Sequence, residues 1–229
     1  MKILALSASD MEHASSVVTG LSSLEIEKLS TREGPFPGTP HHRLTMAQHH
    51  LDLVKNHDLS DVKAIYLDTF GDYGLDAVRS YSGLPVIGAG ESSLVVARAL
   101  APRFLIVTVW PESMRFIYTE RLQSTRTGDA CAGVIHVKRQ EQSPSAILKE
   151  TRAPQGQLKS EVLIAARKAI RDMDVDAIVL GCTCMAGMHQ DISQALPVPV
   201  ICPSRTGLGF ALGAAVCGWR QSDRLTPRK

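Results

Sequence analysis

The nonapeptide DVKAIYLDT (61–69) returns later in the chain as DVDAIVLGC (174–182). The Asp, Val, Ala, Ile and Leu positions coincide, and the order of neighbouring motifs is also repeated. LPVI (84–87) recurs at a similar interval as VPVI (198–201), and the apolar run that begins at Ile3 has its counterpart near Leu105. A single matching nonapeptide arises by chance, but an ordered set of matches indicates an internal duplication.

The repeated segments have the pattern of buried strands that alternate with helices. Short apolar runs bounded by turn residues occur at 3–6, 64–67, 85–87, 105–109, 177–180 and 199–201. Such runs are typical of strands buried on both faces of a parallel sheet. Helical spacing between them is shown by Leu44, Ala47, Leu51 and Val54, and again by Val162, Ala166, Ile170 and Met173. This alternation predicts an α/β fold of two pseudo-symmetric, flavodoxin-like halves with parallel sheets.

Composition and charge exclude several classes of protein. The chain has 229 residues, of which 44% are hydrophobic and 21% charged, and its formal net charge is +2. This composition is that of a globular domain, and the charge gives no reason to expect binding to nucleic acid or an anionic membrane. No run approaches the ~20 apolar residues of a membrane span. The N-terminus predicts a buried first strand and no signal peptide, so we expect a cytoplasmic protein.

The ends of the predicted strands are the expected place for function. Ligands of open parallel sheets bind outside the carboxyl ends of the strands. Two similar halves that face each other would form one active site between them, with Thr69 and Cys182 on opposite sides of the ligand. Ser7, Ser9 and the segment at Trp110 and Pro111 are expected to line the same cleft.

The five cysteines do not form a pattern of paired disulfides, and we expect most of them to be reduced core residues, with Cys182 as the candidate exception. Cys182 is the candidate for chemistry because it lies between a predicted strand and a predicted helical stretch. Backbone N–H groups and the positive end of a helix dipole would favour its thiolate, which can act as a nucleophile or general base. The alternative is a small buried hydrophobic residue, and position alone leaves both open.

Three segments together resemble a known family. LDTFGDYGLDAV (67–78), LPVIGAGESSLVVA (84–97) and DAIVLGCTCMAG (176–187) are similar to the Asp/Glu racemase superfamily, and most of all to its hydantoin and allantoin racemase branch. The resemblance implies two α/β halves with the active site between them. It also implies proton transfer at a carbon next to a carbonyl, without a cofactor, between two cysteines. Because the family's last helix packs on the first half, we expect domains at 1–98 plus 206–229 and at 99–205.

The sequence departs from the family's pattern at two places. The family's second cysteine corresponds to Cys182, but Thr69 occupies the position of the first. Ser7-Ala8-Ser9 stands where hydantoin racemases carry Asn-Pro-Asn. A threonine hydroxyl is far less acidic than a thiol, although it can donate a hydrogen bond to a substrate oxygen.

The departure at Thr69 leaves several functions open. For a racemase or isomerase of a small hydantoin-like or amino-acid-derived substrate, Thr69 could position a water, or Asp68 or Asp72 could replace the thiol. A decarboxylase or hydrolase would need Cys182 alone. A non-catalytic ligand-binding member is the remaining alternative.

The full set of expected site residues follows from the strand ends and the resemblance. The catalytic pair is Cys182 and Thr69. The substrate-binding residues are expected to be Ser7, Ser9, Phe70, Gly71, Glu91, Ser92, Trp110, Pro111, Thr183 and Cys184. We expect no metal and no cofactor, a small molecule as the only ligand, and a homo-oligomer.

Two further motifs carry little functional signal. GAGESS (88–93) only half matches a dinucleotide-binding loop, and we interpret it as a tight turn in which Ser92 caps the following helix. The pairs His41-His42 and His49-His50 have no Cys or carboxylate beside them to complete a metal site, and they predict a solvated helix or loop.

Overall fold

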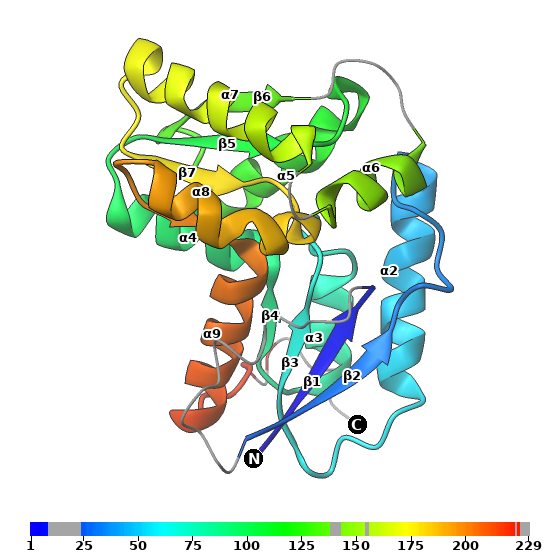
Figure 1. Ribbon diagram of the computed structural model, residues 1–229. Coiled ribbons are helices and arrows are strands. Elements are labelled where there is room, and N and C mark those ends of the chain that lie inside the picture. Colours follow the sequence, from blue (N-terminus) through cyan, green and yellow to red (C-terminus); the bar gives the residue numbers. More distant parts are fainter. Residues whose placement is uncertain (9–23, 138–142, 154–155, 223, 225–229) are drawn as a thin grey trace. The chain divides into compact units, whose positions relative to one another are not determined.

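The computed structural model describes residues 1–8, 24–137, 143–153, 156–222 and 224 (Figure 1). The chain forms two compact units. Unit 1 consists of Met1–Ala89 and Gly207–Lys229, and unit 2 of Gly90–Thr206. The chain passes from one unit to the other at the start of α4 (Ala89–Leu100) and within α9 (Pro203–Val216).

Unit 1 contains a parallel sheet of four strands in the order β2-β1-β3-β4. The strands are β1 (Lys2–Ser7), β2 (Glu25–Ser30), β3 (Val62–Leu67) and β4 (Val86–Gly88). Helices α2 (Pro40–Lys55) and α3 (Leu75–Ser82) complete the unit together with α9. This strand order is the flavodoxin-like one, in which the chain reverses its direction of progress between β1 and β3.

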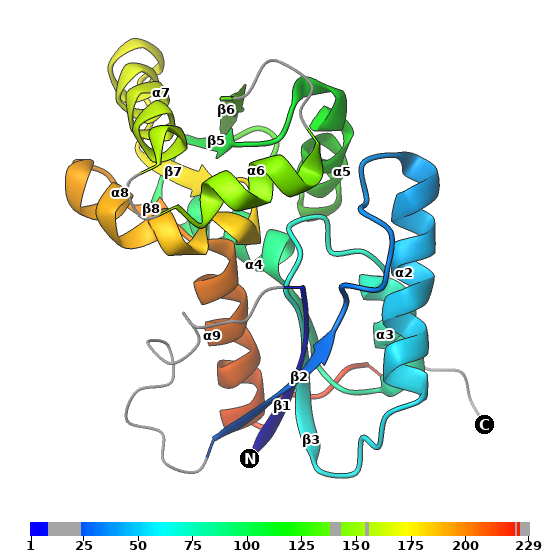
Figure 2. The same ribbon diagram turned by 45° about the vertical axis from the view of Figure 1, so that its right-hand side comes forward.

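The two faces of this sheet are covered by different helices. Ile3 and Ala5 on β1 pack against Leu208 and Ala211 of α9. The intervening β1 residues, Leu4 and Leu6, point to the other face and join the core formed with α2 and α3. Figures 1 and 2 show α9 on one side of the strands and α2 and α3 on the other. Successive residues of β1 point to opposite faces of the sheet, and helices cover both faces. All of these residues are therefore buried, which explains the continuous apolar run.

Unit 2 repeats this plan with the strand order β6-β5-β7-β8, again all parallel. Its strands are β5 (Phe104–Thr108), β6 (Cys131–His136), β7 (Ala177–Leu180) and β8 (Val200–Ile201). Its helices, besides α4, are α5 (Arg115–Thr125), α6 (Pro144–Thr151), α7 (Gln157–Met173) and α8 (His189–Ala195), with short 3₁₀ helices η1 (Glu112–Met114) and η2 (Thr183–Met188). Residues 105–107 and 177–180 are fully buried.

The prediction of two α/β halves with parallel sheets is confirmed. The repeated nonapeptides form β3 and β7, which occupy the same position in their sheets, and the Pro-Val-Ile motifs form β4 and β8. Two strands were not predicted, β2 and β6. Both lie at a sheet edge, and most of their residues are only partly buried, so their sequences lack a continuous apolar run.

The helix predicted from the spacing of Leu44, Ala47, Leu51 and Val54 is α2, although the side chain of Leu44 is 73% exposed. Two local predictions were wrong. The buried residues of that helix are Met46, His50 and Val54, so His50 is not solvated. Ser92 does not cap a helix, because α4 already begins at Ala89.

Among the helices described, none has the length and apolar character needed to cross a membrane.

Candidate functional site

At the carboxyl edge of the unit 1 sheet, a buried carboxylate joins two adjacent strands. Ser7 ends β1 and donates a hydrogen bond from its hydroxyl to one oxygen of Asp68, at 2.6 Å. The hydroxyl of Tyr66, on β3, donates to the other oxygen at 2.7 Å. All three side chains are buried. Both oxygens of Asp68 thus accept a hydroxyl donor, and the side chain holds together the two strand ends beside the topological switch point.

Thr69 follows directly and begins the turn after β3. Its backbone carbonyl accepts the N–H of Asp72 at 3.2 Å, which closes the turn. Its hydroxyl oxygen is buried and has no hydrogen-bond partner among the residues that the structure describes. A buried hydroxyl without a partner is uncommon and calls for an explanation. A ligand oxygen that accepts this hydroxyl would supply one.

Two glycines allow the turn after Thr69 to pack closely. A Cβ atom on Gly88, the last residue of β4, would lie 2.3 Å from a carboxylate oxygen of Asp72, so only glycine lets that carboxylate approach the strand. A Cβ atom on Gly71 would lie equally close to the ring of Tyr73. Asp72 itself is buried and has a positive φ of 48°. These close approaches fix the turn against β4.

His50, a residue that sequence reasoning did not connect with the site, supports this turn from α2. Its Nδ1 lies 2.7 Å from the carbonyl oxygen of Tyr73. Burial lowers the pKa of His50 to about 4, although the hydrogen bond to Tyr73 opposes that shift. The ring is therefore neutral near pH 7, and because a carbonyl only accepts, its proton is on Nδ1. The buried Met46-His50-Val54 spacing of α2 is the sequence signal that was available.

In unit 2 a chain of hydrogen bonds ends at the residue before Cys182. The phenol of Tyr118, on α5, donates to the carbonyl oxygen of Gly181 at 2.9 Å. Because the single phenol proton is used there, the Thr108 hydroxyl donates to the phenol oxygen, and it accepts the N–H of Trp110 at 3.2 Å. Burial raises the pKa of Tyr118, so the phenol remains a donor at neutral pH. The chain connects the end of β5 to the end of β7.

Gly181, like Gly88 in unit 1, is packed too closely to allow a side chain without movement of its neighbours. A Cβ atom at this position would lie 2.8 Å from the Cβ of Thr108 and 3.1 Å from the ring of Tyr118. Because Gly181 has no side chain, the end of β7 can pack against α5. There the Tyr118 phenol reaches the Gly181 carbonyl. Sequence reasoning did not identify Thr108 or Tyr118, because the Tyr118 phenol bonds to Gly181, 63 residues away along the chain.

Cys182 lies two residues past the end of β7 and is the N-cap of the short helix η2. Its Sγ accepts the backbone N–H of Cys184 at 3.0 Å, which confirms that a backbone donor reaches this sulfur. The expected helix dipole is weaker than predicted, because η2 is a short 3₁₀ helix and α8 begins only at His189. The structure also joins Cys182 and Cys184 as a disulfide. This disulfide was not predicted, while Cys131, Cys202 and Cys217 are free, as expected for most of the cysteines.

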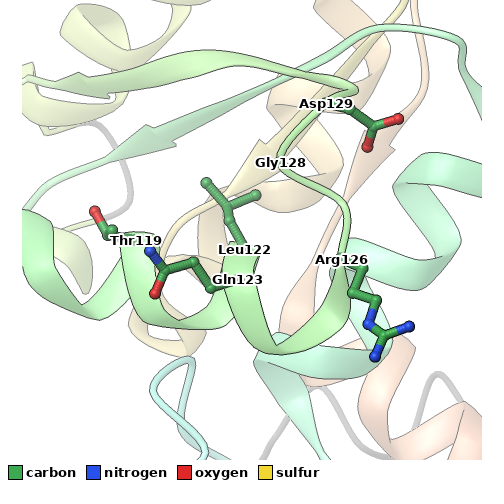
Figure 3. A pocket seen from close by; sticks show the side chains of 6 residues that line it. All are labelled: Thr119, Leu122, Gln123, Arg126, Gly128 and Asp129. Carbon is green, nitrogen blue, oxygen red and sulfur yellow. The ribbon is translucent and has the colours of Figure 1, made fainter.

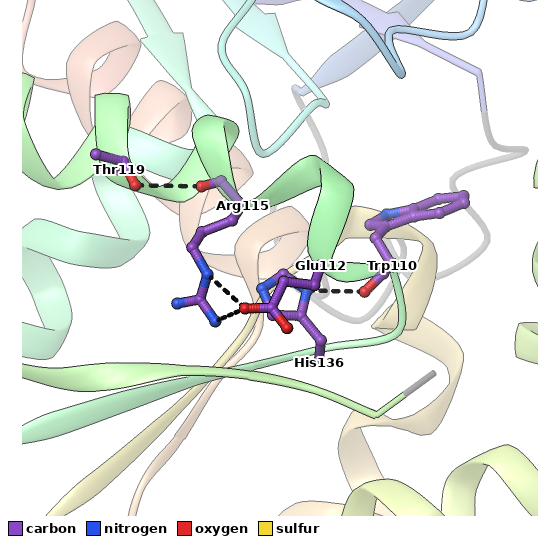
Figure 4. Close-up of polar contacts among 5 residues, drawn as sticks. All are labelled: Trp110, Glu112, Arg115, Thr119 and His136. Atoms are coloured by element: carbon purple, nitrogen blue, oxygen red, sulfur yellow. Dashed lines mark hydrogen bonds and ion pairs between the residues drawn. The ribbon is translucent and has the colours of Figure 1, made fainter. Parts of the chain in front are cut away.

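His136 lies at the end of β6, at the carboxyl edge of the unit 2 sheet. Nδ1 of His136 lies 2.9 Å from the carbonyl oxygen of Trp110, and its buried Nε2 has no partner among the described residues. Burial lowers the pKa of His136. Figure 4 shows the hydrogen bond of His136 to Trp110 and the ion pair in which the Glu112 carboxylate accepts a hydrogen bond from Arg115 at 2.8 Å. His136 thus orients the Trp110 backbone, which was predicted to contact the substrate.

The predicted site residues are distributed over both units. Unit 1 holds Ser7, Thr69, Phe70 and Gly71 at or just after strand ends. Unit 2 holds Glu91, Ser92, Trp110, Pro111, Cys182, Thr183 and Cys184. Ser9 lies outside the described residues. Within each unit the predicted strand-end residues do lie at one edge of the sheet, whereas Glu91 and Ser92 lie in the first turn of α4.

A hollow on the surface of unit 2 involves none of these residues. It is lined by Thr119, Leu122, Gln123, Arg126, Gly128 and Asp129, on α5 and the turn that leads to β6 (Figure 3). Within the described part of the chain, no three His, Cys, Asp or Glu side chains are grouped so that they could hold a metal ion.

Comparison with known proteins places this architecture in a known class. The model of the family described as Asp/Glu/Hydantoin racemase matches residues 17–211. A hydantoin racemase of Paenarthrobacter aurescens is 28% identical over 166 residues, which are 72% of this chain and 67% of that protein. One of Pseudomonas sp. (strain NS671) is 30% identical over 161 residues, 70% of this chain and 61% of that protein. The solved structure of allantoin racemase from Klebsiella pneumoniae has a TM-score of 0.83 at 23% identity and covers 100% of this chain and 94% of its own.

The duplicated α/β fold and these relatives define the chain as a racemase-type enzyme, an isomerase. It belongs to the Asp/Glu/Hydantoin racemase family, whose model matches most of its length. The family resemblance expected from the three sequence segments is thereby confirmed. The correspondence of Thr69 to the family's first cysteine stays a prediction.

Proposed function

We propose that the protein racemises a small hydantoin-like compound by proton transfer at the ring carbon next to a carbonyl, with Cys182 as the acid/base and no cofactor. The observation that carries the proposal is the place of the Cys182 sulfur. Cys182 lies two residues past the last residue of β7, at the carboxyl edge of the sheet, and its sulfur accepts a backbone N–H. The substrate class is supported by the hydantoin racemases that are 28% and 30% identical to this chain.

The chemistry requires a base and a place for negative charge. Loss of the proton leaves an enolate-like anion whose charge lies mainly on the carbonyl oxygen. In the reduced protein, the Cys182 thiolate takes this proton and can return it. The N–H of Cys184 favours the thiolate, since a hydrogen bond to the charged form stabilises that form. Hydrogen-bond donors placed at the developing oxyanion lower the barrier further.

Thr69 is the residue of unit 1 that we assign to the substrate oxygen or to a water beside it. Its buried hydroxyl has no partner among the described residues and is therefore available as a donor. Asp68 is assigned a positioning role, because both of its oxygens already accept hydroxyl groups. The water that Thr69 would hold is our candidate for returning a proton to the face opposite Cys182.

Tyr118 and Thr108 are positioning residues in this proposal. Their hydrogen bonds fix the Gly181 carbonyl, and this peptide leads directly into Cys182. They act on the reaction through the backbone that carries the thiol.

A second candidate function is favoured by the distribution of cysteines. Residues 1–130 contain no cysteine, so this part of the chain cannot supply a second thiol to the opposite face. A decarboxylase or hydrolase that uses one thiol needs no such partner. Protonation of an enediolate from one side by Cys182 is the chemistry that this candidate implies.

Deuterium exchange distinguishes the candidates. Reduced protein is incubated in heavy water with single enantiomers of 5-benzylhydantoin and allantoin, and deuterium at the chiral carbon and optical rotation are followed together. Racemisation gives deuterium uptake with loss of rotation, and Cys182→Ser abolishes both. Cys217→Ser is the matched control, because Cys217 is exposed and free, and it should leave both rates unchanged.

Other outcomes contradict the proposal in recognisable ways. Exchange without loss of rotation indicates one-sided proton transfer. Release of carbon dioxide or ring opening, tested with arylmalonates and with the hydantoins, indicates the second candidate. Racemisation by the Cys182→Ser variant at the wild-type rate would show that Cys182 is not the acid/base.

A further inference from the structure

Cys182 and Cys184 are held close together by the local backbone. One residue separates them in sequence, their Cα atoms lie 5.2 Å apart, and the structure joins them as a disulfide. Cα separations of disulfide-bonded cysteines are ~4.4–6.8 Å, so this turn brings both thiols to bridging distance. Cys184 belongs to η2 and Cys182 is its N-cap, so both thiols lie within unit 2.

The two sulfurs have different environments, which suits an oxidation in which Cys182 reacts first and Cys184 second. Cys182 is buried, with 8% of its surface exposed, and receives the N–H of Cys184. Cys184 is partly exposed at the start of η2. Thiolates are the forms that react with peroxides, and a sulfenic acid that has a second thiol beside it condenses to a disulfide.

We propose that Cys182-Thr183-Cys184 is a site of reversible oxidation by hydroperoxides, in which Cys184 is the resolving thiol. The Cys182 thiolate attacks one peroxide oxygen, the O–O bond breaks, and Cys182 becomes a sulfenic acid while the hydroxide or alkoxide that leaves takes up the proton released by the thiol, as water or an alcohol. The Cys184 thiol then attacks the Cys182 sulfur, the sulfenic oxygen leaves as water with the thiol proton, and the disulfide forms. The peroxide gains the two electrons that the two thiols lose. A dithiol such as dithiothreitol reverses the change by thiol–disulfide exchange.

The functional consequence rests on the proposed function of Cys182 as acid/base. In the disulfide, the Cys182 sulfur carries no proton and no negative charge, so it cannot take a proton from substrate. Oxidation would therefore stop catalysis and reduction would restore it. Cys184 would also protect the enzyme, because a sulfenic acid that is not resolved proceeds to sulfinic acid, which thiols do not reverse.

Mass spectrometry tests the oxidation independently of any catalytic assay. Fully reduced protein is treated with hydrogen peroxide, the remaining thiols are alkylated with iodoacetamide, and the peptide that contains residues 182–184 is analysed without reduction. In the wild type we expect this peptide to lose two hydrogen atoms and to escape alkylation, and dithiothreitol should restore alkylation completely. Cys184→Ser should instead accumulate sulfinic acid at Cys182, which dithiothreitol does not reverse. Cys217→Ser, the matched control, should behave as the wild type.

The result that overturns the proposal is equally specific. If wild-type Cys182 proceeds to sulfinic acid as fast as in Cys184→Ser, or does not react with peroxide in either protein, Cys184 is not a resolving thiol. The racemase assay on the same samples separates this failure from that of the proposed function. A disulfide that forms in a protein without racemase activity leaves the oxidation site standing, and racemase activity that survives complete oxidation refutes the role of Cys182 as acid/base.

Discussion

The phenol of Tyr118 donates a hydrogen bond to the carbonyl oxygen of Gly181, across 63 residues of sequence. The bond is fully buried and is the last in a chain that runs from the Trp110 N–H through Thr108. It connects α5 to the end of β7, one residue before Cys182. The position of the proposed acid/base is therefore set by side chains that belong to distant parts of unit 2.

Removal of this phenol hydroxyl should destabilise the protein. In Tyr118→Phe the Gly181 carbonyl and the Thr108 hydroxyl both lose a buried partner, so we expect the free energy of unfolding to fall by about 1–3 kcal/mol. Urea denaturation measures the change. Tyr81→Phe is the control, because Tyr81 is 47% exposed, and its free energy of unfolding should change by less than about 0.5 kcal/mol. Equal stabilities of Tyr118→Phe and wild type would show that the hydrogen bond contributes nothing.

The central strands could be predicted from the sequence because burial on both faces of a sheet requires a run of apolar residues, which is visible locally. β5 and β7 are buried on both faces, and residues 104–107 and 177–180 are uninterrupted apolar runs. The edge strand β2, EIEKLS, buries little, so its sequence does not indicate a strand unambiguously. The duplication also indicated that Thr69 and Cys182 follow equivalent strands, which the sheet order confirms.

Contacts between distant segments were not predictable from local patterns. Which face of α2 is buried depends on its packing in unit 1, and there His50 is enclosed while Leu44 is exposed. The spacing of Met46, His50 and Val54 is that of one helix face, but it gives no sign of the carbonyl that His50 will meet. The Cys182–Cys184 pair was visible in the sequence, but its disulfide depends on the backbone of η2.

Substitution by alanine should change the free energy of unfolding differently at Gly181 and at Gly187, the two glycines near Cys182. Gly181→Ala would place a Cβ 2.8 Å from Thr108 and 3.0 Å from Ile106, both in the rigid β5 strand, and we expect a loss of ~1–3 kcal/mol in unfolding free energy. A Cβ at Gly187, in the same turn, meets nothing within 4 Å. Gly187→Ala should therefore leave stability unchanged or raise it by ~0.4–1 kcal/mol. Thermal and urea unfolding of both variants test this, and similar stabilities would contradict the close packing at Gly181.

His50 should make stability depend on pH between about 4 and 6.5. Its pKa is about 4 in the folded protein, below the value of 6.5 for a free histidine. As the pH falls through this window, the unfolded chain binds a proton that the folded protein does not, so stability decreases. The full effect is about 3 kcal/mol for one such group.

A pair of variants isolates this contribution from those of other histidines. In His50→Asn the amide N–H can still donate to the Tyr73 carbonyl, but no group titrates, so the loss of stability between pH 7 and pH 4 should be smaller than in the wild type. His41→Asn is the control, because His41 is exposed on the same helix. Urea unfolding at several pH values provides the comparison. Parallel curves for His50→Asn and wild type would show that His50 does not titrate differently in the two states.

Removal of the Thr69 hydroxyl should lower activity without lowering stability. Its hydroxyl has no partner among the described residues, so Thr69→Val, which replaces the hydroxyl with a methyl group of similar size, removes no hydrogen bond that the structure shows. We expect the free energy of unfolding to be retained or increased, and kcat/KM for hydantoin racemisation to fall about 10- to 100-fold, as for loss of a donor worth ~1.5–3 kcal/mol. Thr69→Cys should instead raise the rate of racemisation, because a thiol can return a proton to the second face. A Thr69→Val variant that loses stability and keeps full activity would show that the hydroxyl serves the fold and does not contact the substrate.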